Sequence, residues 1–206
     1  MPISFPVPIR TLQISDGDKK RIYYPQMYGT NSQALEAYVN RSIVEQTQKL
    51  INQQIGETPS TVEEMLGTYK LKNNQRQVLS LSLSNYTYHH HAAHGMTYIK
   101  SLTFDLKNGK KYELKDLFKP NSDYVNRISK LVQEQIKERD ILTLEPFSNI
   151  KPDQDFYIAD KTLVIYFQLY ELTAYAFGFP MFPLSVYSLL DIIDESGPLG
   201  RMAENN

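Results

Sequence analysis

All four histidines of this chain lie within six residues, at His89, His90, His91 and His94. Neutral imidazoles bind zinc, copper or nickel, so a pair such as His90 and His94 would suit one of these metals. This segment joins two predicted strands, however, and no carboxylate nearby in sequence would orient a ligating ring. A polar loop with exposed imidazoles is the favoured interpretation, and we predict neither a metal site nor a cofactor. Because histidine titrates near neutral pH, pH-sensitive binding is a second hypothesis.

Carboxylates in the second half invite a hydrolase interpretation, since acid–base catalysis on glycans needs two carboxyls in unlike surroundings within one cleft. The candidates are Asp153, Asp155, Asp160, Glu171, Asp191, Asp194 and Glu195. The first three lie at predicted turns, where carboxylates accept backbone N–H groups for structural reasons. Among these carboxylates, Glu171 is the first choice for a substitution that tests catalysis. Cysteine is absent, which excludes thiol nucleophiles and Cys-ligated metals, and no G-x-S-x-G elbow occurs. We therefore predict no catalytic residue.

Aromatic residues are concentrated near the end of the chain. Ten of the 15 Tyr and 9 Phe residues lie between Phe156 and Tyr187, and no Lys or Arg follows Lys161 within that stretch. Exposed tyrosines bury much area at low entropic cost and recur as anchors in recognition loops. The alternative is packing inside the core. We predict a partner-contacting surface made by Tyr170, Glu171, Tyr175, Phe177, Phe179 and Phe182.

The bulk composition is that of an ordinary globular protein, with 41% hydrophobic and 22% charged residues in a chain of 206. A net charge of −1 argues against nucleic-acid binding, which needs a basic surface. The first eight residues contain three prolines and no uninterrupted apolar run, so neither a signal peptide nor membrane insertion is expected. We expect a cytoplasmic location for the chain as written.

Periodicity predicts the elements of the first half. Extended segments are expected from Ile3 to Ile22, followed by a long helix that starts at Asn31 or Ser32 and stops at Gly56. Residues 75–88 alternate leucine with serine and predict a strand, as do residues 96–106. Asn108-Gly109 then supplies a tight turn.

The second half has fewer elements. A second helix is predicted from Asn121 or Ser122 to about residue 138, then a hairpin around residues 159–161. The fold class is therefore α+β, with antiparallel sheets, two main helices packed on them and two associated lobes. We place these lobes at residues 1–90 and 91–197, followed by a flexible tail at 198–206.

Several short motifs occur in a characteristic order: Ala93-His94-Gly95, Leu102-Thr103-Phe104-Asp105, Asn108-Gly109-Lys110, Leu114-Lys115-Asp116-Leu117-Phe118, Val164-Ile165-Tyr166-Phe167, Tyr170-Glu171 and Tyr175-Ala176-Phe177-Gly178. They resemble the bacterial domain of unknown function 3298 (DUF3298), which ends the lysozyme-sensing anti-sigma factor RsiV. The first lobe, 1–90, is similar to the companion domain of unknown function 4163 (DUF4163), which the deacetylase PdaC also carries.

This resemblance implies a non-catalytic binding module that recognises a protein, lysozyme-like in the case of RsiV, or a cell-wall-related ligand. His94, the histidine that matches the motif, joins the predicted partner-binding residues. The relatives act outside the cytoplasm. Two other interpretations stay open at this point: an accessory to a cell-wall glycan hydrolase or deacetylase, and an intracellular regulatory or structural subunit.

Overall fold

The computed structural model describes residues 6–204 and divides into two compact units, Met1–Gly109 and Lys110–Asn206. Each unit combines helices with antiparallel strands, so the predicted α+β class is confirmed. The division falls after the Asn108-Gly109 turn, whereas the sequence placed it after residue 90. The reason is that β5 (Met96–Asp105) pairs along nearly the whole of β4 (Val78–His89) and so belongs to the first unit. Residues 3–5 of the predicted extended start lie outside the described residues.

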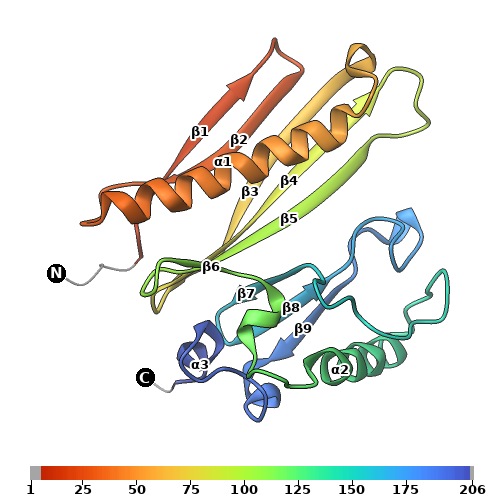
Figure 1. The fold of residues 1–206 in the computed structure, drawn as a ribbon. Helices are drawn as coiled ribbons and strands as arrows, with labels where there is room; N and C mark the ends of the chain where they lie inside the picture. The colour runs from red at the N-terminus through yellow and green to blue at the C-terminus, as the bar shows by residue number, and fades with distance from the viewer. Residues whose placement is uncertain (1–5, 205–206) are drawn as a thin grey trace. The chain divides into compact units, whose positions relative to one another are not determined.

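The first unit is a twisted sheet with one long helix across it (Figure 1). Its other strands are β1 (Ile9–Ser15), β2 (Lys20–Met27) and β3 (Val62–Gln75), in the order β1-β2-β3-β4-β5. All neighbouring pairs are antiparallel except β2 and β3, which run parallel over three residues. A single 3-10 turn, η1 (Pro59–Thr61), leads into β3.

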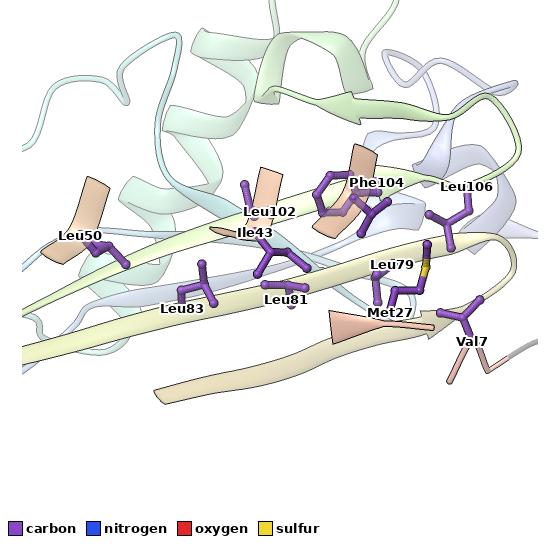
Figure 2. Close-up of a cluster of buried hydrophobic side chains, with 11 residues drawn as sticks. Val7, Met27, Ile43, Leu50, Leu79, Leu81, Leu83, Leu102, Phe104 and Leu106 are labelled. Atoms are coloured by element: carbon purple, nitrogen blue, oxygen red, sulfur yellow. The ribbon is translucent and has the colours of Figure 1, made fainter. Parts of the chain in front are cut away.

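The helix α1 (Gln33–Ile55) begins and ends where the sequence predicted. Ser32 caps it by accepting the Leu35 N–H at 3.3 Å, and Gly56 ends it with a φ of 57° that favours glycine. Its buried face packs on the leucines of β4 and β5. Figure 2 shows Ile43 and Leu50 of the helix among these strand side chains.

The second unit is built around a three-stranded antiparallel sheet in the order β7-β8-β9 (Figure 1). Its elements, in chain order, are β6 (Lys110–Tyr112), η2 (Leu114–Leu117), α2 (Tyr124–Glu138), β7 (Phe156–Ala159), β8 (Thr162–Tyr166), η3 (Tyr175–Phe177), β9 (Met181–Ser185), η4 (Val186–Leu189) and α3 (Pro198–Ala203). The predicted second helix is present, although it begins at Tyr124 after Asp123 and not at Asn121 or Ser122, and the hairpin at residues 159–161 is present as well.

Helix α2 covers the outer edge of β9. Gln135 Nε2 donates to the Pro183 carbonyl at 2.8 Å, and an Arg139 guanidinium nitrogen donates to the Met181 carbonyl at 2.9 Å. A strand edge exposes carbonyls that other chains can pair with, so these two side chains protect it.

The expected flexible tail at 198–206 is instead the helix α3 as far as Ala203. Pro198 occupies its first position, where the missing N–H costs nothing. Leu199 and Met202, three residues apart on one face, are both fully buried. Burial of these two side chains explains why this segment is structured.

Candidate functional site

The aromatic segment, defined here as residues 170–182, divides into an exposed part and a buried part. Tyr170 and Phe177 are each 47% exposed, whereas Tyr175 and Phe179 are half-buried. The rings of Tyr170 and Tyr175 lie 5.5 Å apart at 35°. The single turn η3 carries Tyr175 and Phe177 and ends at Gly178, whose φ of 82° favours glycine. Three of the predicted rings therefore lie together on one short stretch of surface.

Phe182 was predicted to belong to this surface, and the structure contradicts that prediction, because its side chain has no exposed area. It lies in β9, where alternate residues face opposite sides of the sheet. Its ring meets Phe167 edge to face at 5.7 Å, and the Arg139 guanidinium lies 5.4 Å from its centroid. Phe182 supports the surface from inside and cannot contact a partner.

The turn at residues 168–171 holds Tyr170 in an unusual backbone conformation. Its φ is 63°, in the left-handed region that tyrosine seldom adopts. Glu171 fixes this turn: Oε2 accepts the Gln168 N–H at 2.8 Å, and the Glu171 N–H donates to the Gln168 carbonyl at 3.1 Å. The carboxylate of Glu171, a candidate for acid–base chemistry, is thus occupied in shaping the loop.

Glu171 also forms an ion pair with Lys151, at 2.6 Å between Oε1 and Nζ. The hydrogen bond that Lys151 donates to this carboxylate raises the pKa of Lys151, and the charges of Asp153 and Asp155 act in the same direction. Asp155 Oδ2 accepts a further hydrogen bond from Gln168 Nε2 at 2.7 Å. These contacts tie the aromatic segment to the chain that precedes β7.

A hollow of about 460 Å³ lies beside Tyr170 and Glu171. Its other wall is formed by residues 144–149 of the segment 142–149, which runs between α2 and β7. The two walls are joined by a hydrogen bond from the Leu144 N–H to the Leu172 carbonyl at 2.9 Å. Phe147 meets Phe167 edge to face at 6.1 Å. Sequence reasoning missed this wall, because residues 142–149 follow neither helical nor strand periodicity.

The apolar residues of the 142–149 segment are themselves exposed. Leu142 is 86% exposed and Leu144 is 51% exposed, which are the two highest values among the large hydrophobic residues described. Exposed apolar side chains gathered beside exposed rings are typical of interaction surfaces. The candidate site therefore consists of two neighbouring segments, 142–149 and 170–179.

The histidines lie in the first unit, apart from the aromatic segment in the chain. His89 is structural: Nδ1 pairs with Thr61 Oγ1 at 2.7 Å and Nε2 with the Gln54 carbonyl at 2.8 Å. His90 pairs with the Glu63 carboxylate, and this contact lowers the pKa of Glu63. Glu63 lies in β3, so a strand distant in sequence supplies the carboxylate that is missing near the histidines in the chain.

The predicted binding residue His94 is exposed, and its Nδ1 donates to the Gly95 carbonyl at 2.9 Å. Within residues 6–204, no group of three His, Asp or Glu side chains is arranged to hold a metal ion. Across the same residues, no helix has both the length and the apolar character that crossing a bilayer requires.

Comparison with a protein-family model gives a match within the second unit. Residues 115–187 match the family model described as "Protein of unknown function (DUF3298)", so the predicted DUF3298 resemblance is confirmed for this stretch. It covers α2, the three-stranded sheet and the whole candidate site. The similarity of the first lobe to DUF4163 and PdaC stays a prediction.

Among individual proteins, the chain is similar to the anti-sigma-V factor RsiV of Bacillus subtilis (strain 168), with 30% identity over 170 residues. The match covers 72% of this chain and 56% of RsiV, so it spans only about half of that relative. Two solved structures of DUF3298 family proteins, from Bacteroides fragilis and Pseudomonas aeruginosa, share the fold. Each has a TM-score of 0.71 and covers 97% of this chain and 98% of its own, at 13% and 12% identity respectively.

Proposed function

We propose that the second unit is a non-catalytic protein-binding module whose contact surface is the exposed part of the aromatic segment, residues 170–179. The observation that carries this proposal is the pairing of exposed Tyr170, on a turn that Glu171 fixes, with half-buried Tyr175 at 5.5 Å, next to exposed Phe177 in η3. A fixed backbone lowers the entropy lost on association, so each ring can contribute fully to affinity.

The partner we propose is lysozyme or a lysozyme-like protein. The resemblance to RsiV supports this choice, and the proposed residues lie inside the stretch that matches DUF3298. Such a partner implies that the module works outside the cytoplasm, in contrast to the location expected from the N-terminal residues.

A binding role also agrees with how the nearby carboxylate is used. A general acid or base needs a carboxyl that can exchange its proton with substrate. Both oxygens of Glu171 already accept hydrogen bonds, from Lys151 and from the Gln168 N–H. We therefore assign Glu171 the role of positioning Tyr170.

Titration of immobilised lysozyme with the purified chain tests the proposal. Tyr175→Ala should weaken binding by about 2 kcal/mol, or roughly thirtyfold, as expected for an anchoring ring. The matched control is Tyr187→Ala, since Tyr187 is 45% exposed but lies beyond β9 and contacts Lys161. Equal affinities for the two variants, or no binding of the unaltered chain, would contradict the proposal.

A further inference from the structure

The 142–149 segment has backbone groups without hydrogen-bond partners. Its ends are anchored: the Ile141 N–H donates to the Ile136 carbonyl at 3.0 Å and the Ile150 N–H to Ser129 Oγ at 2.9 Å, and both isoleucines are buried. Between these anchors Leu144 bonds to Leu172. From Glu145 to Asn149, no backbone group makes a hydrogen bond to any residue within 6–204. This stretch offers carbonyl acceptors to an incoming chain.

The hollow beside this segment has an excess of negative charge. Glu145 lines it, and its carboxylate forms no ion pair or hydrogen bond with the described residues. The only other charged groups of its lining, Lys151 and Glu171, neutralise each other as a pair. Glu145 therefore supplies the unbalanced charge.

The whole second unit also carries a net negative charge. The unit from Lys110 to Asn206 contains 11 Lys and Arg against 15 Asp and Glu, a formal net charge of −4. The pKa of Lys151 is raised mainly by its hydrogen bond to Glu171, and the carboxylates of Asp153 and Asp155 act in the same direction.

We propose that the hollow receives a cationic side chain, arginine being the best fit, from an extended segment of the protein partner. This inference rests on the proposed function and specifies the chemistry of the partner. The guanidinium would pair with Glu145 and donate to the free carbonyls of residues 145–149. Its stem and plane would lie against Phe147 and Tyr170, which line the hollow.

Arginine suits this site better than lysine for two reasons. Its guanidinium presents five donors in a plane, which matches a carboxylate beside a row of backbone carbonyls, whereas an ammonium has three donors around one atom. The flat cation also stacks on aromatic rings, and the hollow has such walls on two sides. A neutral or acidic side chain would cover the exposed Glu145 without pairing with its carboxylate, which is unfavourable.

The probe for this proposal is N-acetyl-arginine amide, titrated into the isotope-labelled full chain and followed by amide NMR shifts. We expect shifts at residues 144–149 and 170–172 with dissociation in the millimolar range, as for a ligand of this size. N-acetyl-citrulline amide, a neutral isostere, should give at least tenfold weaker binding. Glu145→Gln should remove the preference for arginine, and Glu134→Gln, at another exposed glutamate without a partner in the described residues, should keep it. Equal shifts from both probes, or shifts elsewhere only, would overturn the proposal.

A second measurement separates this inference from the proposed function. In lysozyme binding, Glu145→Gln should lower affinity about tenfold at low salt and weaken its salt dependence, with Glu134→Gln unchanged. An unchanged affinity for Glu145→Gln would refute the cationic side chain while leaving the aromatic surface intact. If lysozyme fails to bind the unaltered chain, the proposed function fails, and the arginine titration decides the inference alone.

Discussion

Tyr170 should reverse the usual order of glycine and alanine substitutions. An exposed non-glycine residue normally loses stability when replaced by glycine rather than alanine, because glycine gains more backbone freedom in the unfolded chain. Tyr170 has a φ of 63° and lies in a turn clamped by Glu171. Alanine would keep the cost of that conformation, whereas glycine would relieve it.

The size of the reversal follows from two opposing contributions. The left-handed conformation costs a residue with a Cβ roughly 1–2 kcal/mol. The extra unfolded-state freedom of glycine costs roughly 0.5–1 kcal/mol. Tyr170→Gly should therefore be more stable than Tyr170→Ala by about 0.5–1 kcal/mol. Both variants lose the same ring, so side-chain packing cancels in this comparison.

Urea denaturation of the two variants measures the difference directly, as a midpoint shift of about 0.3–0.5 M. Phe177 provides the matched reference, since it is also 47% exposed but is not among the described residues with positive φ. There, Phe177→Ala should be more stable than Phe177→Gly. If Tyr170→Ala is more stable than Tyr170→Gly, the turn is not held as we describe.

Three further predictions concern single sites. Thr173 is fully buried and its Oγ1 has no hydrogen-bond partner among the described residues. Thr173→Val should therefore raise the free energy of unfolding by about 1 kcal/mol. A lower free energy of unfolding for the variant in urea denaturation would show that this hydroxyl does have a hydrogen-bond partner. A methyl group added at Gly95 would overlap the Tyr86 ring, so Gly95→Ala should cost about 2 kcal/mol in the same assay, and much less when combined with Tyr86→Ser. Because the pKa of Lys151 is raised in the folded chain, its pairing with Glu171 stabilises the fold below the unfolded pKa of about 10.4, and this contribution disappears as pH rises through the folded value. The difference in unfolding midpoint between the unaltered chain and Lys151→Met should therefore close in alkaline buffer, and a constant difference across that range would argue against the pair.

The helices and the central strands could be predicted from sequence because their local signals agree. Ser32 and Gly56 mark the ends of α1, and alternating leucines mark β4. The strand β3 was missed, because it contains two glutamates, a glycine and two asparagines, which are uncommon in strands. It turns into β4 through Arg76 and Gln77, both at positive φ, where Asn-Gly would have been the recognisable signal.

The candidate site was only partly predictable for a different reason. Its exposed rings were found from composition, but composition does not separate Tyr170 from Phe182. That separation depends on β9, whose Pro183 argues against a strand in the sequence yet is tolerated at the sheet edge. The 142–149 wall is held by contacts with residues 129 and 172, which no local pattern encodes.

Hydrogen–deuterium exchange of the full chain, with and without saturating lysozyme, tests most directly whether residues 170–179 form a protein-contact surface. We predict slower exchange at residues 142–149 and 170–179 in the bound state, and at the same lysozyme concentration a smaller change in Tyr175→Ala. Slower exchange confined to the first unit, or no change at these two segments while lysozyme is bound, would contradict the account.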